Sequence, residues 1–237
     1  MAIATVPRGR EDEKGLFRIA TGAGIGLAAA LLAVVIPTGF LLFASYDSGG
    51  FVSLQQTALI DAMGLLILAG AILFLISLFL YRRGFAHLRK VDSRFWAASI
   101  LCLIGSIGFL LILVAAVAIV GGSNGFLSCM NGHPAQALSC LRSGNPVGAY
   151  AGLLGFWLGW LGGVGIVVGL SAGSSRFHVR EIAVGSLLYA ILLLALIGPS
   201  IALVVSFPGV EFILVVVPIL SLLAPYFVFR GARPLVT

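Results

Sequence analysis

The sequence predicts an all-α membrane protein: a single domain over residues 1–237, built as a bundle of six transmembrane helices with both termini cytoplasmic. Hydrophobic residues make up 60% of the chain and charged residues only 9%, whereas soluble domains carry about 25% charged residues. Six apolar segments of 22 to 26 residues follow one another. Each is long enough to cross a hydrocarbon core of about 30 Å with some tilt. The chain is therefore expected to be a multi-pass protein of the plasma membrane.

The chain before the first apolar segment, residues 1–18, is polar and is predicted to be a cytoplasmic tail. The first span follows at residues 19–44. It is too long for the apolar core of a cleaved signal peptide, and its exit lacks a small-x-small cleavage site, so we expect it to remain in the mature protein. Pro37 is expected to kink this span. The other five spans are predicted at residues 57–81, 95–120, 147–172, 182–206 and 208–229.

The distribution of basic residues predicts the orientation. Thirteen of the 14 lysines and arginines fall on one side if both termini share that side, and only Arg142 falls on the other. Because cytoplasmic loops of membrane proteins carry an excess of Lys and Arg, this bias places both termini in the cytoplasm. The net charge of +6 then reflects topology, and direct nucleic-acid binding is not expected.

The fourth predicted span carries a glycine-rich face between residues 151 and 173. On a helical wheel of about 100° per residue, its glycines fall within an arc of roughly 160°. Small residues spaced four apart let a neighbouring helix approach closely in lipid. We therefore expect this segment to be the buried central helix of the bundle, with residues 20–26 of the first span as one candidate partner. Glycine is frequent in transmembrane helices generally, but its confinement to one face favours a packing role for Gly155, Gly159, Gly163, Gly165, Gly169 and Gly173.

The outward side holds one substantial loop, residues 121–146, which contains Cys129 and Cys140. An extracellular compartment favours oxidation, and closing a loop of this size restrains it by about 3 kcal/mol in the chain-entropy model. A disulfide between these two cysteines is the prediction, and two free thiols are the alternative. Cys102 lies inside the third span and is expected to be a small buried apolar side chain.

Two acidic residues near the outer ends of spans raise the hypothesis of a transport path. Asp61 and Glu211 each lie about one turn inside the outer end of a predicted span. Ionisable groups within spans commonly mark ion or proton paths. The alternative is that both are boundary residues, which reach water or pair with Arg142.

Prolines within two spans allow a similar pair of interpretations. Pro199 in the fifth span, and Pro218 and Pro225 in the sixth, each remove a backbone hydrogen bond from a membrane helix. Broken helices are where transporters place substrates and gates. Static kinks are the alternative.

The cytoplasmic loop at residues 81–95, YRRGFAHLRKVDSRF, is short, basic and amphipathic. We expect Phe85 and Leu88 to dip into the membrane interface while the cations of the loop meet anionic lipid headgroups. A cytoplasmic partner or nucleic acid is the alternative occupant. The cations of this prediction are Arg82, Arg83, Arg89 and Lys90.

Residue patterns give little support to catalysis. Residues 169–173, GLSAG, match G-x-S-x-G, but that motif acts only where a strand turns sharply into a helix beside a histidine and an acid. Here it ends a membrane span, and His87, His133 and His178 all lie outside the spans. No His, Cys or carboxylate group has metal-ligand spacing, and no phosphate-binding GxxxxGK loop occurs. The sequence therefore predicts no metal, no cofactor and no enzymatic activity.

The cytoplasmic loop also carries a resemblance. The end of the second span reads LYRRGFAHL at residues 80–88, and it is followed by VDSRF and by a third span that begins FWAASILCLIGSIGF. Over residues 60–120 this pattern, with the general layout, resembles an archaeal family of multi-span membrane proteins, the domain-of-unknown-function 973 family. The resemblance implies an archaeal plasma membrane. It implies no activity and carries over no functional residue.

Two functions of different classes fit these features. The first is a structural or accessory subunit of a membrane assembly, with the lipid bilayer and other membrane subunits, or further copies of itself, as partners. Extensive small-residue packing surfaces favour it. The alternative is a channel or transporter subunit that moves a solute, an ion or DNA across the plasma membrane. Inverted repeats of spans one to three and four to six, each set opening with a glycine-rich helix, would suit this alternative.

Overall fold

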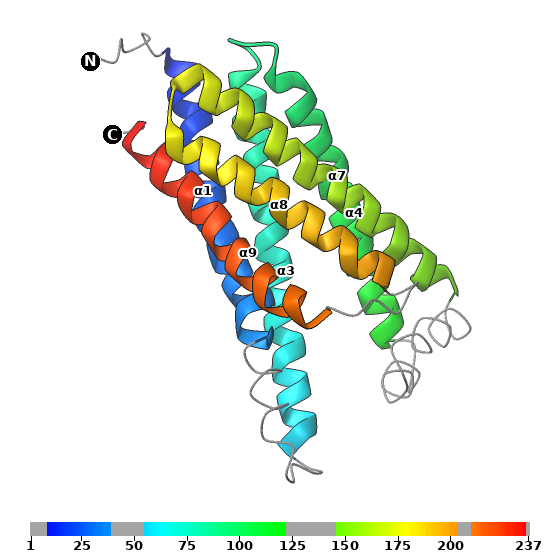
Figure 1. The fold of residues 1–237 in the computed structure, drawn as a ribbon. Helices are drawn as coiled ribbons and strands as arrows, with labels where there is room; N and C mark the ends of the chain where they lie inside the picture. The colour runs from blue at the N-terminus through cyan, green and yellow to red at the C-terminus, as the bar shows by residue number, and fades with distance from the viewer. Residues whose placement is uncertain (1–8, 39–54, 122–145, 203–209, 236–237) are drawn as a thin grey trace.

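A computed structural model describes residues 9–38, 55–121, 146–202 and 210–235 (Figure 1). The described residues form an all-helical bundle, which confirms the predicted fold class. Among the described residues, five helical segments are long and apolar enough to cross a membrane. In chain order the elements are α1 (Arg10–Ala30), the π-helical turn η1 (Leu31–Val35), α3 (Gln55–Leu88), α4 (Phe95–Gly121), α7 (Pro146–Phe177), α8 (Arg180–Ala202), α9 (Val210–Ala232) and the short 3₁₀ turn η2 (Arg233–Leu235).

The first helix begins earlier than the sequence predicts. α1 begins at Arg10, inside the predicted cytoplasmic tail, with Gly9 as its N-cap. The first turn carries Glu11, Asp12 and Glu13, and negative charge at a helix N-terminus is stabilised by the helix dipole. The Asp12 carboxylate also accepts a hydrogen bond of 3.3 Å from the Gly9 N–H. Residues 10–18 are therefore part of the folded bundle and not of a loose tail.

A π-helical turn interrupts α1 just before Pro37. The Ile36 N–H donates to the carbonyl of Leu31, five residues earlier, and the helix then continues to Thr38. A proline ring clashes with the carbonyl four residues before it, and a π-helical turn is one way in which a helix makes room for such a disturbance. The predicted irregularity at Pro37 thus takes the form of a widened turn.

The predicted cytoplasmic loop at residues 81–95 is mostly helix. α3 continues to Leu88, and only residues 89–94 separate it from α4. The side chains of Phe85 and Leu88 are 0% and 1% exposed, so the prediction that they enter the membrane interface is wrong. They belong to the core because the extra two turns of α3 lie against α1 and α7: Gly15 packs on Leu88, and Gly169 packs on the Phe85 ring.

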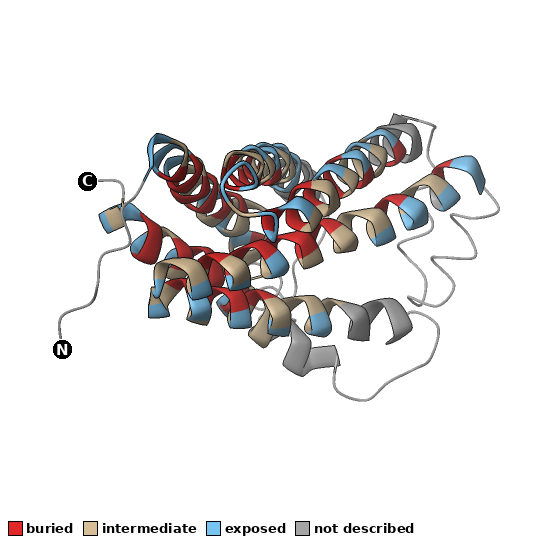
Figure 2. Ribbon diagram, turned by 90° about the horizontal axis from the view of Figure 1, so that it is seen from above, coloured by how far each residue is buried: buried red, intermediate tan, exposed pale blue. Residues whose placement is uncertain are grey.

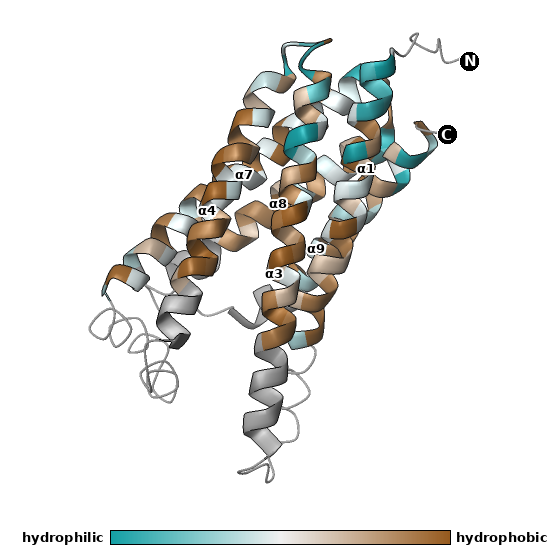
Figure 3. Cartoon of the chain, turned by 180° about the vertical axis from the view of Figure 1, so that it is seen from behind, coloured by the Kyte–Doolittle hydropathy of each residue, from teal (hydrophilic) through white to brown (hydrophobic). Residues whose placement is uncertain are grey.

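The six helices are arranged in a closed ring (Figures 1 and 2). Each helix packs against its neighbours in the chain, and α9 closes the ring by packing against α1. Across the ring, α3 and α7 make a small contact. The predicted central position of α7 is therefore wrong: α7 is one member of the ring and lies between α4 and α8. The start of α1, the end of α9, residues 89–94 and residues 178–179 lie at one end of the ring, called the basic end here (Figure 3).

The principal partner of the glycine-rich α7 is α4. A Cβ atom added to Gly105 would collide with the backbone of Gly162, and one added to Gly108 would lie 2.5 Å from the backbone nitrogen of Gly159. The two backbones are therefore in direct contact, as small residues allow in lipid. The candidate partner, residues 20–26 of α1, lies elsewhere: Gly22 faces Leu80 of α3, with 3.3 Å between the Leu80 Cβ and an added Cβ.

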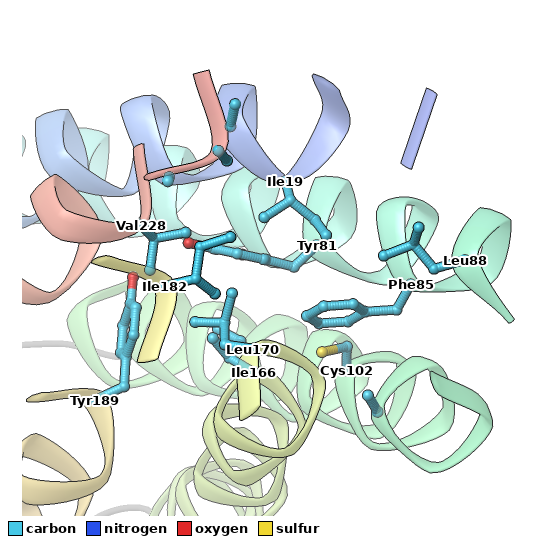
Figure 4. Close-up of a cluster of buried hydrophobic side chains, with 14 of the residues drawn as sticks. Ile19, Tyr81, Phe85, Leu88, Cys102, Ile166, Leu170, Ile182, Tyr189 and Val228 are labelled. Atoms are coloured by element: carbon cyan, nitrogen blue, oxygen red, sulfur yellow. The ribbon is translucent and has the colours of Figure 1, made fainter. Parts of the chain in front are cut away.

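The core fills the ring towards its basic end (Figure 4). The Phe85 ring stacks between Tyr81 and Phe95, with centroids 6.0 and 6.1 Å away, and Tyr81 meets Tyr189 of α8 edge to face at 6.5 Å. The outer faces of the helices carry exposed apolar side chains, as expected for surfaces in contact with lipid. Among the most exposed are Leu65, Val114, Leu187 and Leu194.

Candidate functional site

An ion-pair network at the basic end joins three distant parts of the chain. The guanidinium Nη2 of Arg176, near the end of α7, lies 3.2 Å from both carboxylate oxygens of Asp12, in the first turn of α1. The Nη1 of Arg176 lies 3.6 Å from the carboxylate of Asp92, in the turn between α3 and α4. Asp92 also accepts a hydrogen bond of 3.0 Å from the Arg94 N–H. Arg176 of α7 therefore links the first turn of α1 to the turn between α3 and α4.

Burial makes the Asp12 pair costly to break. The Asp12 side chain is only 3% exposed, and the Arg176 side chain is 20% exposed. A buried charge is tolerated where it is paired, and removing one partner leaves the other uncompensated. Pairing is incomplete on the arginine side, because the buried Nε of Arg176 has no hydrogen-bond partner among the described residues. The guanidinium also lies 5.6 Å from the centroid of the Phe177 ring, within the range of a cation–π contact.

A second, more exposed cluster lies beside the first. The carboxylate of Glu11 contacts His87 Nδ1 at 2.7 Å and accepts a hydrogen bond from Lys90 at 3.2 Å. Lys14 lies 3.9 Å from its other oxygen. Glu11 is in the polar first turn of α1, ahead of the apolar part of the helix. The hydrogen bonds from His87 and then Lys90 lower the pKa of Glu11 to about 2, so this carboxylate stays charged and pins α1 to the end of α3.

The chemistry of this site is electrostatic. Within the described ranges, no group of three His, Cys, Asp or Glu side chains could hold a metal ion. Ser171, the serine of the GLSAG motif, lies inside α7, and its carbonyl accepts hydrogen bonds from the Ser174 and Ser175 hydroxyls. That helical setting differs from the strand-to-helix turn in which the motif is catalytic. The basic end can hold helix ends together and can attract anions.

The four cations predicted to contact lipid headgroups have different surroundings. The guanidinium groups of Arg82 and Arg83 lie 5.7 and 4.6 Å from the centroid of the Phe79 ring. Arg89 is exposed, whereas Lys90 contacts Glu11. Headgroup contact by Arg82, Arg83, Arg89 and Lys90 stays a prediction.

The six glycines predicted to pack do so unequally. Four meet neighbours closely: Gly155 against α4, Gly163 against Leu193, Gly165 against α4 and Gly169 against Phe85. Gly159 and Gly173 would meet the nearest side chains at 3.8 and 4.0 Å, which is ordinary van der Waals contact. The face is therefore shared among α3, α4 and α8.

Several predicted residues lie beyond what the structure describes. Cys129, Cys140 and Arg142 are outside the described residues. Asp61 lies in α3 and Glu211 in α9, in segments whose side chains are not described. Cys102 is described and buried, as predicted, and its thiol points to the Gly162 carbonyl at 3.8 Å.

Sequence reasoning missed Asp12, Asp92 and Arg176 as partners. A signal for them was present: of only eight acidic residues in the chain, three occur together in the first turn of α1, on the side where the cations gather. A concentration of carboxylates there predicts ion pairs with neighbouring helix ends. The choice of Arg176, among all the cations of that side, depends on the ring order of the helices.

Comparisons of this chain with protein-family models, with curated proteins and with solved structures found no match. The resemblance over residues 60–120 therefore stays a prediction.

Proposed function

We propose that this chain is a non-catalytic structural or accessory subunit of a membrane assembly in the plasma membrane. One observation carries the proposal: two buried serines, Ser77 and Ser186, join neighbouring helices of the ring, whereas Ser106 and Ser221 bond within their own helices. Ser77 donates to the Gly22 carbonyl at 2.7 Å, which links α3 to α1, and Ser186 donates to the Val167 carbonyl at 3.0 Å, which links α8 to α7. Such hydroxyls serve as interhelical contacts in lipid, and they are not held free for a solute.

The filled basic end supports the same proposal. Tyr81, Phe85 and Phe95 stack side by side within the ring, and each is 0% exposed. The ion pairs of Asp12 and Arg176 then tie the helix ends around this aromatic core. A rigid, packed bundle with a wide apolar outer surface suits a subunit that other membrane proteins, or further copies of this chain, pack against.

A channel or transporter subunit, for a solute, an ion or DNA, is the second candidate, and one observation favours it. The irregular segments of two helices are neighbours: η1 of α1 contacts α9, which contains Pro218 and Pro225. Pro225 also lies next to the regular part of α1, because a Cβ atom added to Gly26 would lie 3.8 Å from the Pro225 Cβ. Irregular segments in adjacent helices are typical of places where transporters move.

Purification of the tagged full-length chain from its own membrane in a mild non-ionic detergent tests the proposal. Mass spectrometry of the purified material is expected to find a partner membrane protein in stoichiometric amount, or a defined oligomer of the chain. An unrelated six-span protein with the same tag is the control for adventitious co-purification. If the chain emerges as a monomer without a stoichiometric partner in several mild detergents, the accessory function is contradicted. Solute flux through liposomes that contain it is then the next measurement.

A further inference from the structure

A shallow hollow of about 430 Å³ lies at the basic end, between the start of α1 and the end of α3. Its lining residues are Glu13, Lys14, Phe17, Arg18 and His87. The two helices that form the hollow are in close contact, because Gly15 packs on Leu88 and Gly84 packs on Ile19. The hollow is therefore a fixed feature of the α1–α3 pair.

The charges of the hollow favour an anion. Lys14 and Arg18 are four residues apart and so lie on one face of α1. Arg18 has no ion-pair partner among the residues that the structure describes. His87 uses Nδ1 for Glu11, which leaves Nε2 as its second ring nitrogen. Glu13 opposes these groups with one negative charge, and Glu11, which lies 3.9 Å from Lys14, adds a second. Glu11 also contacts Lys90, so the three cations Lys14, Arg18 and Lys90 outweigh the two carboxylates by one charge.

An apolar stripe leads from this hollow along the outside of α3. Ile72, Ile76 and Phe79 are 45%, 43% and 37% exposed. Their spacing of four and three residues, continued to Arg83 and His87, places all five side chains on one face of the helix. Phe17, at the edge of the hollow, is 58% exposed. Cationic groups at the end of the helix are thus followed by apolar side chains within the candidate membrane span Leu65–Leu88.

We propose that this hollow binds the phosphate headgroup of an anionic phospholipid, with an acyl chain lying along Ile72, Ile76 and Phe79. Lys14 and Arg18 contact the phosphate. The apolar stripe favours a lipid over free phosphate as the ligand, because a soluble anion has no acyl chain to contact these side chains. The site is separate from the exposed loop cation Arg89, and it does not depend on whether the chain is an accessory subunit or a transporter.

Titration of the purified chain in a neutral detergent tests the site, with short-chain phosphatidylglycerol as the probe and phosphatidylcholine, which is zwitterionic and has no net charge, as the comparison. Native mass spectrometry reports the bound lipid. The wild-type chain is expected to prefer phosphatidylglycerol. The double variant Lys14→Gln/Arg18→Gln is expected to bind it about 25-fold more weakly, at about fivefold for each lost cation near the membrane surface. Glu13→Gln, which removes the opposing charge, is expected to bind it more tightly.

Two matched variants keep the result interpretable. Arg94→Gln/Arg180→Gln removes the same charge from exposed positions at the same end and is expected to leave binding unchanged. Lys14→Arg/Arg18→Lys keeps both charges and is expected to retain binding. Equal binding by the wild-type chain and the Lys14→Gln/Arg18→Gln variant would overturn the proposal. So would displacement of phosphatidylglycerol by millimolar inorganic phosphate, which would assign the hollow to a soluble anion.

Discussion

Arg176 and Asp12 are 164 positions apart in the chain, yet one guanidinium nitrogen lies 3.2 Å from both oxygens of the buried carboxylate. This contact joins the first turn of α1 to the last turns of α7, which are not direct neighbours in the ring. The same arginine reaches Asp92 in the turn before α4. The pair therefore braces the basic end across the ring, where the aromatic core lies beneath it.

Arg176→Gln is expected to destabilise the chain by about 3 to 5 kcal/mol, because the buried Asp12 carboxylate is left without its counter-charge. SDS titration of the detergent-solubilised protein, followed by Trp fluorescence, measures the free energy of unfolding. Arg180→Gln is the matched control, since Arg180 is an exposed cation on the other side of the same turn. Adding Asp12→Asn to Arg176→Gln is expected to recover part of the loss. Equal stability of the Arg176 and Arg180 variants would contradict this role for the pair.

Alanine at Gly165 and at Gly159 is expected to have opposite effects, although both positions lie on α7. A Cβ atom at Gly165 would lie 2.7 Å from the Leu101 Cβ and 2.9 Å from a backbone nitrogen of α4, so the helices must separate. At Gly159 the nearest side-chain atoms are 3.8 Å away, so alanine gains about 1 kcal/mol of helix propensity. The same unfolding assay compares them, and an equal change in both variants would exclude tight α4–α7 packing at Gly165.

Phe85→Ala is expected to destabilise the protein by about 3 to 5 kcal/mol, the usual cost of removing a buried aromatic side chain. The Phe85 ring is fully buried between Tyr81 and Phe95. Leu194→Ala is the control, because Leu194 is 67% exposed on the outer face of α8. Thermal unfolding in detergent distinguishes the two. If the Phe85 variant were as stable as the Leu194 variant, burial of Phe85 in the core would be contradicted and a position at the membrane interface would be supported.

His178 supplies a test of the turn between α7 and α8. Its φ of 53° is in the left-handed region, which glycine adopts freely at helix C-termini and other residues adopt at a cost. His178→Gly is expected to be close to neutral. His178→Val is expected to cost about 1 to 2 kcal/mol, because a β-branched residue is strongly disfavoured there. If valine were tolerated as well as glycine in the unfolding assay, the turn would have a different conformation.

The existence of the helices could be predicted because long apolar segments have few alternatives to helix in lipid. Their ends on the basic side of the ring could not be placed from hydropathy. α1 begins at Arg10 and α3 continues to Leu88 because tertiary contacts extend both helices: Asp12 pairs with Arg176, and Gly84 lets Ile19 approach. A polar segment is predicted to be a loop when the residues that it contacts in the folded protein are not known.

The glycine face of α7 predicts close packing but not its partner. α4 has only Gly105 and Gly108 in its interior, with a third glycine, Gly121, at its end, and α1 carries four glycines from Gly15 to Gly26. By sequence, α1 is the stronger candidate. In the structure α7 packs on α4, the helix before it in the chain. The number of glycines in a helix therefore did not identify the partner of α7.

The closed ring is the central claim, and a cross-link between α1 and α9 tests it most directly. In a chain whose native cysteines, Cys102, Cys129 and Cys140, are replaced by alanine, Gly26→Cys and Pro225→Cys place their Cβ atoms about 3.8 Å apart, the mean spacing in disulfides. Oxidation in the membrane is expected to give an intramolecular disulfide for this pair and none for Gly26→Cys with Gly159→Cys. Cross-linking of the second pair and not of the first would contradict the ring and place α7 beside α1, as in a bundle built around a central helix.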